Sequence, residues 1–231
     1  MMNIDKPKFI TFEGVEGSGK STQSKILYEY LLSKNIKAIH TREVGGTVEA
    51  EKMRHLLIHS ELMSKSELLL VMAARYEHIN KVIIPALVEG NWVICDRFVD
   101  SSACYQFRES GLTLEDIYEL HDKLMTVSYD NAAENITYSK IDMHKFTSQG
   151  IMPDITFFMD ISPELGLKRA TTRGGANKFE SKDISFHCTI YKRFKTIESM
   201  YKNRFLSIEC VDKTIREIHK DILDKIFHTN I

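Results

Sequence analysis

Proline and cysteine are scarce in this sequence, with four of each among 231 residues. So few prolines argue against a collagen-like or disordered chain, and an apolar content of 43% is ordinary for a globular protein that buries a core. No apolar run approaches the roughly 18 residues that a membrane-spanning helix requires. The composition therefore indicates a folded chain, and we expect no membrane partner.

The cysteines are too scattered for a cysteine-based framework. No two of them have C-x-x-C spacing, which argues against a zinc site, and unclustered cysteines in a chain of this size are typical of a reducing compartment. Residues 1–8 contain no apolar segment of the kind found in secretory signals. We therefore expect a cytoplasmic protein.

An excess of charge of either sign is also absent. The 31 lysines and arginines nearly balance the 32 aspartates and glutamates, which gives a formal net charge of −1. A general nucleic-acid-binding protein would carry a basic surface, so we expect no nucleic-acid partner. The balance leaves room for a local basic pocket that binds a small anion.

Short apolar segments alternate with helical patterns along the chain. Five such alternations predict an α/β fold, a three-layer sandwich in which helices flank a five-stranded, mainly parallel sheet. We expect one domain over residues 1–231. Ligand sites in such sheets lie beyond the carboxyl ends of the strands. The predicted strands are Phe9–Phe12, Ile36–Thr41, Trp92–Cys95, Ile155–Asp160 and Phe205–Cys210.

Several residues predict where helices begin and end. Ser64 and Glu67 have the spacing of a capping box that opens a long helix. Pro85 is expected to kink the last turn of that helix, and Gly90 to end it. Asp212 is expected to cap the last helix of the chain.

Two segments lack regular periodicity. Residues 127–150 are rich in Ser, Asn and Thr, and we interpret them as an inserted surface loop or a contact segment. Residues 171–183 combine two glycines with basic residues, which is typical of a lid over an anion.

A phosphate-loop motif follows the first predicted strand. Residues 14–21 read Gly-Val-Glu-Gly-Ser-Gly-Lys-Ser and match G-x-x-x-x-G-K-[ST] between a strand and a helix. Glycines let backbone N–H groups converge on a phosphate, and the start of the helix adds its positive end. The lysine reaches the outer phosphates, and the last serine can bind Mg²⁺. The predicted triphosphate ligands are Gly14, Val15, Glu16, Gly17, Ser18, Gly19, Lys20, Ser21 and Thr22.

Other charged residues follow the third strand or lie on the long helix. Asp96 and Arg97 come directly after Trp92–Cys95, where an acid can hold Mg²⁺ and an arginine can hold a second phosphate. They could equally form a solvated pair at a helix start. Arg75 lies among small and apolar residues, so we expect it to reach either a buried acid or a bound anion.

The order of these motifs resembles that of bacterial thymidylate kinases, a family of phosphate-loop nucleoside monophosphate kinases. The likeness covers about residues 8–125 and 151–195. The motifs that carry it lie at residues 12–22, 41–47, 73–75, 96–98, 101–106, 153–156 and 166–174.

The resemblance implies transfer of the ATP γ-phosphoryl group to dTMP, which gives dTDP for dTTP synthesis, with Mg²⁺ as cofactor and a homodimer as the assembly. In this reading Lys20 and the loop hold ATP, while Ser21 and Asp96 support Mg²⁺. Arg97 and Arg75 would hold the phosphate of dTMP.

The resemblance also assigns the acceptor nucleoside. Glu16 corresponds to the loop acid near the acceptor sugar, and Tyr105, with Ser102 and Gln106, corresponds to the residues that recognise deoxyribose and base. A tyrosine close to C2′ would disfavour ribonucleotides by its bulk.

Members of the family that it resembles place a catalytic arginine either in the phosphate loop or in the lid, and residues 16–18 contain none. The resemblance therefore implies that the lid supplies the charge that stabilises the transition state. The resemblance makes Arg173 the first candidate and Arg169 the second. With Lys20 and Arg97, these are the predicted catalytic residues.

Three positions depart from the family pattern: Val44 replaces a proline, Lys178 replaces a lid arginine, and Val71 replaces the aromatic residue that stacks on thymine. The change at Val71 leaves open a kinase for another nucleotide. A phosphate-loop GTPase or ATPase switch is a further alternative. Residues 177–180 superficially match a guanine-reading motif, but they end in glutamate and lie in the lid.

Overall fold

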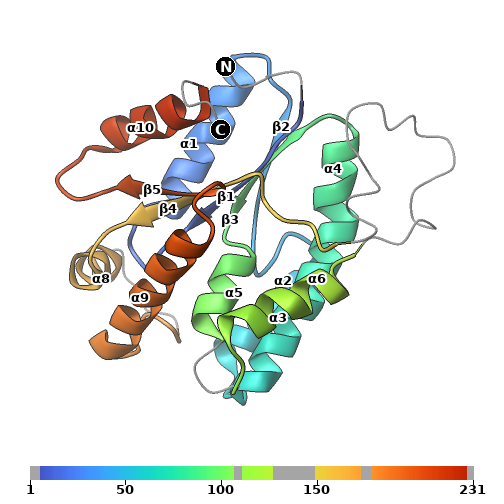
Figure 1. Ribbon diagram of the computed structural model, residues 1–231, viewed down its shortest axis with the longest axis vertical. Helices are drawn as coiled ribbons and strands as arrows, with labels where there is room; N and C mark the ends of the chain where they lie inside the picture. Colours follow the sequence, from blue (N-terminus) through green and yellow to red (C-terminus); the bar gives the residue numbers. More distant parts are fainter. Residues whose placement is uncertain (1–5, 107–110, 127–148, 173–177, 228–231) are drawn as a thin grey trace, which may run out of the picture.

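The computed structural model describes residues 6–106, 111–126, 149–172 and 178–227. Its centre is one sheet in which the strand order is β2-β3-β1-β4-β5 and every pairing is parallel. The predicted architecture is confirmed (Figure 1). The strands are β1 (Phe9–Glu13), β2 (Ala38–Arg42), β3 (Trp92–Asp96), β4 (Ile155–Asp160) and β5 (Phe205–Glu209).

Helices lie on both sides of this sheet. Helices α1 and α10 pack against each other over one face, and α5, α6 and α9 lie on the other side in Figure 1. No helix in the described ranges is long and apolar enough to cross a membrane. The helices are α1 (Lys20–Ser33), α2 (Val48–His59), α3 (Ser64–His78), α4 (Ile84–Val88), α5 (Val99–Tyr105), α6 (Leu114–Leu124), α8 (Pro163–Thr171), α9 (Ile184–Met200) and α10 (Ile215–Phe227), with a π-helical turn η1 (Ile79–Ile83) between α3 and α4.

The core explains why the central strands read as continuous apolar runs. Every residue of β1 is buried, and so are the first four residues of β3, because both strands are covered by helices on each side. Strand β2 lies at the edge of the sheet and is partly exposed. A buried central strand that ends at Glu13 brings the loop after it to the carboxyl edge of the sheet.

The predicted capping box at Ser64 and Glu67 is wrong. Ser64 is already the first helical residue of α3, and its hydroxyl donates to the carbonyl of Gln106 at 3.4 Å. Glu67 instead pairs with Lys178. Both side chains have tertiary partners that local spacing does not reveal.

At the carboxyl end of this long helical segment, the structure agrees better with the predicted kink and helix end. The π-helical turn η1 lies just before α4, in which Pro85 is the second residue, so the irregularity falls slightly earlier than the predicted kink. Gly90 ends α4 as predicted, with a φ of 82° and its N–H donating to the carbonyl of Leu87 at 3.0 Å.

The predicted cap at Asp212 is wrong. Helix α10 begins three residues later, at Ile215, and a capping box forms between Thr214 and Glu217. The Thr214 N–H donates to Glu217 Oε2 at 2.8 Å, and the Glu217 N–H donates to Thr214 Oγ1 at 3.3 Å.

The predicted insertion falls mostly outside the described residues, and the predicted lid falls partly outside them. Of the predicted insertion at 127–150, the structure describes only residues 149 and 150. Of the predicted lid at 171–183, it describes residues 171–172 and 178–183, so Arg173 also lies outside the description.

Candidate active site

The phosphate loop joins β1 to α1, in the strand–loop–helix context that the sequence predicts. Gly17 and Gly19 have φ angles of 70° and 96°, a region that favours glycine. A Cβ atom on Gly17 would lie 1.9 Å from the carbonyl oxygen of Gly166 in α8. Close packing of α8 therefore requires glycine at this point of the loop.

Lys20 is the first residue of α1 and is almost fully buried. Its Nζ donates to the carbonyl of Val15 at 2.7 Å and lies 3.4 Å from Ser18 Oγ. Burial and the nearby charge of Arg97 lower the pKa of Lys20 to about 8, although acids around it act in the opposite direction. The ammonium group thus lies against the loop, beside the positive end of α1.

Ser21 and Asp96 are in direct contact, so both side chains are close enough to reach one metal ion. The Ser21 hydroxyl donates to Asp96 Oδ2, and the other carboxylate oxygen, Oδ1, is buried without a hydrogen-bond partner in the described part of the chain. A hydroxyl and a free carboxylate oxygen beside a phosphate loop fit Mg²⁺, which takes few protein ligands and completes its shell with phosphate and water. No cluster of three or more acidic, histidine or cysteine ligands occurs among the described residues.

A cavity beside this loop, the donor pocket, contains most of the predicted triphosphate ligands. Three predicted ligands, Gly14, Val15 and Ser18, do not line the donor pocket. Val15 and Ser18 are buried within the loop. The donor pocket is lined by Glu16, Gly17, Gly19, Lys20, Ser21, Thr22, Lys25, His40, Arg42, Glu43, Arg54, Asp96, Arg97 and Glu180.

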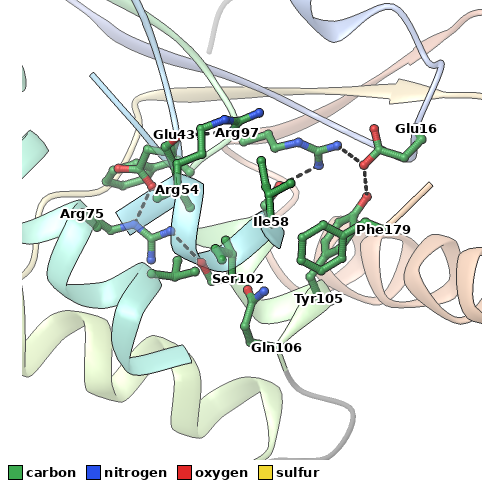
Figure 2. Close-up of a pocket in the computed structure, with 15 residues that line it drawn as sticks. Glu16, Glu43, Arg54, Ile58, Arg75, Arg97, Ser102, Tyr105, Gln106 and Phe179 are labelled. Carbon is green, nitrogen blue, oxygen red and sulfur yellow. Dashed lines mark hydrogen bonds and ion pairs between the residues drawn. The ribbon is translucent and has the colours of Figure 1, made fainter. Parts of the chain in front are cut away.

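A second cavity, the acceptor pocket, brings together all six residues predicted to bind the acceptor (Figure 2). They come from the phosphate loop, α3, the end of β3 and α5. The lining residues are Glu16, Glu43, Val44, Arg54, Leu57, Ile58, Val71, Arg75, Arg97, Phe98, Ser101, Ser102, Tyr105, Gln106 and Phe179. The two pockets share Glu16, Glu43, Arg54 and Arg97.

Arg97 lies between the two pockets. Its φ of 72° is strained for a residue with a side chain, and such strain is concentrated at functional sites. Its Nη2 donates to Glu16 Oε1 at 2.7 Å, and its guanidinium lies over the ring of Tyr105 at 5.1 Å. Burial alone would raise the pKa of Glu16, but Arg97 and Lys20 lower it to about 2.

Glu13 holds the segment that follows Arg97. Its Oε1 accepts hydrogen bonds from the N–H groups of Phe98 at 2.7 Å and Ser101 at 3.2 Å, and the Ser101 hydroxyl donates to Oε2 at 2.5 Å. Burial, with a smaller effect of Asp100, raises the pKa of Glu13 to about 8. The start of α5 is thereby fixed against the end of β1.

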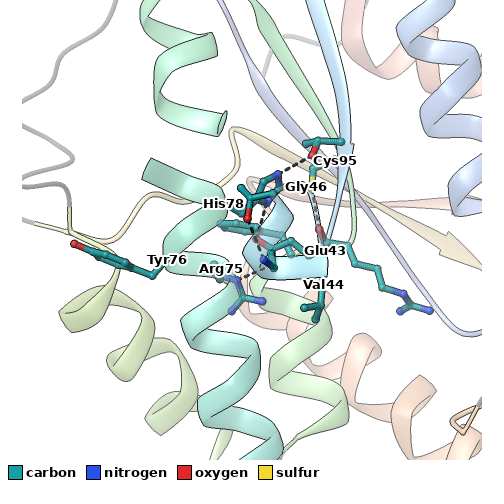
Figure 3. Close-up of polar contacts among 12 residues, drawn as sticks. Glu43, Val44, Gly46, Arg75, Tyr76, His78 and Cys95 are labelled. Carbon is teal, nitrogen blue, oxygen red and sulfur yellow. Dashed lines mark hydrogen bonds and ion pairs between the residues drawn. The ribbon is translucent and has the colours of Figure 1, made fainter. Parts of the chain in front are cut away.

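Arg75 has a buried acid as its partner and still retains a donor without one. Its Nε donates to Glu43 Oε2 at 2.8 Å and its Nη2 to Ser102 Oγ at 2.6 Å, while Nη1 is buried without a hydrogen-bond partner in the described ranges. Figure 3 shows Glu43 beside both Arg75 and His78, whose Nδ1 lies 3.1 Å from Glu43 Oε1. Arg75 lowers the pKa of Glu43 against the effect of burial. The sequence left open whether Arg75 reaches a buried acid or a bound anion. Arg75 pairs with the buried acid Glu43 and keeps Nη1 for an anion, so the two interpretations are compatible.

The two predicted lid cations that the structure describes, Arg169 and Lys178, line neither the donor pocket nor the acceptor pocket. Arg169 donates to the carbonyl of Cys210, just beyond β5, at 3.3 Å and lines neither pocket. Lys178 pairs with Glu67 at 2.5 Å and donates to the carbonyl of Ser60 at 3.0 Å. Arg173 lies outside the described residues.

Arg54 and Phe179 are among the pocket residues that were not predicted from the sequence. Arg54, on α2, lines both pockets and donates to the carbonyl of Val44 at 3.1 Å. Phe179 lines the acceptor pocket from a segment predicted only as a lid. The signal for α2 was Thr47, whose hydroxyl caps the helix by accepting from the Ala50 N–H at 3.0 Å.

A phosphate loop at the edge of a parallel sheet, joined to a second cationic pocket, defines a phosphate-loop kinase. The family model described as "Thymidylate kinase" matches residues 12–128 and 125–222. The chain therefore belongs to the thymidylate kinase family, and the resemblance found in its motifs is confirmed.

Known thymidylate kinases are similar to this chain over nearly its whole length. A thymidylate kinase of Rickettsia peacockii is 46% identical over 220 residues, which cover 95% of this chain and 97% of the relative. A thymidylate kinase of Rickettsia typhi is 44% identical over the same shares of both chains. The crystal structure of thymidylate kinase from Ehrlichia chaffeensis superposes with a TM-score of 0.68 at 32% identity and covers 95% of this chain and 98% of that one.

Proposed function

We propose that this protein transfers the γ-phosphoryl group of ATP to dTMP and yields ADP and dTDP. The observation that carries the proposal is the junction of two pockets at Glu16, Glu43, Arg54 and Arg97. Phosphoryl transfer depends on bringing two anions into line and neutralising their charge. Two cations at a common wall are suited to that task.

The donor pocket would hold ATP through the backbone of residues 14–19 and the ammonium group of Lys20. The Lys20 contact with Val15 would be exchanged for contacts to the outer phosphates. Ser21 and Asp96 would hold Mg²⁺, which would neutralise phosphate charge when bound. The buried, unpartnered Oδ1 of Asp96 supports this assignment.

The acceptor pocket would hold dTMP with its phosphate toward Arg97 and Arg54. The unpartnered Nη1 of Arg75 is available to an oxygen of the same ligand. The Tyr105 hydroxyl donates to Glu16 at 3.2 Å, which fixes the tyrosine ring where it would crowd a ribose 2′-hydroxyl. Ser102 and Gln106 would contribute polar contacts to the nucleoside.

The lid supplies the remaining charge in this proposal. Residues 16–18 of the phosphate loop contain no arginine, and we therefore retain Arg173 as the group that stabilises the transferring phosphoryl. Arg169 is the second candidate, although its guanidinium contacts Cys210 in the structure.

We assign residues 1–231 to one kinase domain, with residues 171–183 as the lid and residues 127–150 as an insertion. We also propose a homodimer in the cytoplasm. Exposed large apolar side chains on α2 and α3 support an interface there, since such patches are typical of association surfaces. They are Val48, Leu56, Leu69 and Tyr76.

A coupled assay of ADP release tests the function directly, with dTMP, dUMP, dCMP, AMP and GMP compared as acceptors in the presence of Mg²⁺ and ATP. We expect dTMP to have the highest kcat/KM and removal of Mg²⁺ to abolish turnover. Another nucleotide as the best acceptor would refute the substrate assignment. Family membership does not favour a nucleotide switch, which would hydrolyse GTP slowly and phosphorylate no acceptor.

A further inference from the structure

His78, the last residue of α3, is a fully buried side chain with hydrogen bonds at both ring nitrogens (Figure 3). Its Nδ1 lies 3.1 Å from Glu43 Oε1, and its Nε2 lies 2.7 Å from Thr41 Oγ1. A Cβ atom on Gly46 would lie 2.5 Å from Cδ2 and Nε2 of the ring, so the loop after β2 packs closely against it. The end of β2 and the loop that follows it therefore hold the imidazole in one position.

These contacts fix where the proton of a neutral His78 ring lies. Burial alone would raise the pKa of Glu43, but Arg75 and then His78 lower it, so Glu43 is ionised at neutral pH. An ionised carboxylate only accepts hydrogen bonds, and Nδ1 is therefore the nitrogen that carries the proton. Nε2 is then an acceptor, and the Thr41 hydroxyl donates to it.

The contact with His78 leaves Glu43 only one oxygen for Arg75. Glu43 Oε2 accepts from Arg75 Nε at 2.8 Å, while Arg75 Nη2 donates to Ser102 Oγ at 2.6 Å. A carboxylate with both oxygens free prefers a two-point pair with a guanidinium. Such a pair would take up a second donor of Arg75 and turn its guanidinium. The hydrogen bond from His78 thus limits Glu43 to a one-point contact.

The orientation of Arg75 matters because one of its donors has no partner. Arg75 is 1% exposed and lines the acceptor pocket but not the donor pocket. Its Nη1 is buried without a hydrogen-bond partner within the described ranges. A buried charged donor without a partner is costly, so a ligand oxygen that reaches Nη1 binds more tightly when the guanidinium is already held in place.

We propose that His78 is a positioning residue of the acceptor site: by donating to one oxygen of Glu43, it keeps Arg75 in the orientation that leaves Nη1 to an oxygen of the acceptor nucleotide. The inference rests on the proposed function, because it takes a nucleoside monophosphate as the ligand of Arg75. His78 itself lines neither pocket and acts only through Glu43.

The test compares His78→Asn with His78→Phe in steady-state kinetics. The amide of asparagine can donate to Glu43 in place of Nδ1, whereas phenylalanine keeps the shape of the ring and donates nothing. Loss of a hydrogen bond to a buried charge is expected to raise the KM for dTMP in His78→Phe by roughly 10-fold, with kcat changed less and the KM for ATP unchanged. His78→Asn fills less space but is expected to raise the KM for dTMP by less than about threefold.

Nuclear magnetic resonance of the wild-type protein tests the direction of the hydrogen bonds without any substitution that could cause misfolding. With isotope-labelled histidine ring nitrogens, His78 should be protonated at Nδ1, and its signal is identified by its absence from the spectrum of His78→Asn. A wild-type His78 ring protonated at Nε2 alone would overturn the inference.

The kinetic outcomes separate the inference from the proposed function. If wild-type protein does not phosphorylate dTMP, the proposed function fails. If wild-type protein does so and His78→Phe keeps the wild-type KM for dTMP, or His78→Asn is impaired as much as His78→Phe, only the inference fails. A KM for ATP that rises together with the KM for dTMP would assign His78 a purely structural role and would also overturn the inference.

Discussion

Arg97 Nη2 lies 2.7 Å from Glu16 Oε1, and this ion pair forms part of the wall shared by the two pockets. The arginine side chain is 19% exposed and the glutamate side chain 15%, so solvent screens the pair only partly. A phosphate that entered from either side would meet the same guanidinium. The pair thus links the phosphate loop to the residue that follows β3.

Replacement of Arg97 by alanine is expected to lower kcat/KM for dTMP by roughly 10³-fold, as removal of a preorganised charged donor does in other active sites. Steady-state kinetics measures the effect. Arg216→Ala is the control, since Arg216 is an exposed residue of α10 and should leave kcat/KM unchanged. A loss below about fivefold in Arg97→Ala would remove Arg97 from the catalytic site.

The lowered pKa of Lys20 predicts a pH dependence of ATP binding. Lys20 of the free protein loses its proton as the pH rises through about 8, whereas bound triphosphate favours the protonated form. Binding then takes up a proton, so the affinity for ATP is constant below pH 8 and falls above it by at most about tenfold per pH unit. Calorimetry at pH 7, 8 and 9 measures the slope. Lys20→Arg, which stays protonated, should show a flat profile, and equal slopes in both proteins would contradict the assignment.

Much of this site was predictable because its signals are local. The pattern of residues 14–21 dictates glycine φ angles and a helix start that need no distant partner, and the apolar runs of β1 and β3 follow from their burial. The six predicted acceptor residues lie together because their strand and helix ends meet at the carboxyl edge of a parallel sheet.

The remaining features depend on contacts between distant segments. Glu67 pairs with a lysine 111 positions away, so its spacing from Ser64 misled the prediction of a capping box. Arg54 could not be found as a site residue because α2 was not predicted, and its place in both pockets follows from the packing of α2 against α3. Helix α9 was likewise not predicted, so the turn at Phe179 that precedes this helix could not be placed in the pocket either.

Two glycines of the phosphate loop should differ in their tolerance of alanine. A Cβ on Gly17 meets the backbone of Gly166, whereas a Cβ on Gly19 meets no atom within 4 Å. Both positions have positive φ angles, which cost an alanine about 1–2 kcal/mol. Gly19→Ala should therefore lose about that free energy of unfolding and Gly17→Ala clearly more. Thermal or urea denaturation checks the order, and a Gly17→Ala protein as stable as Gly19→Ala would refute the close approach of α8.

The lid arginines should differ in their kinetic effects. Arg173→Ala is expected to lower kcat by roughly 10²-fold with little change in the KM for dTMP, because a transition-state contact affects turnover rather than ground-state binding. Arg169→Ala is the comparison, and it should affect kcat less. A kcat near the wild-type value in Arg173→Ala would transfer the role to Arg169 or Lys178.

Simultaneous, end-to-end binding of the two nucleotides is the central claim, and a single ligand tests it most directly. Adenosine and thymidine joined by five phosphates would span both pockets across Arg97. Calorimetry with Mg²⁺ should show one molecule of this compound bound per chain, with a lower Kd than ATP or dTMP alone. ATP or dTMP should displace the compound only when that nucleotide is in large excess. A compound that competes with ATP but binds unchanged when the acceptor pocket is saturated with dTMP would contradict the account.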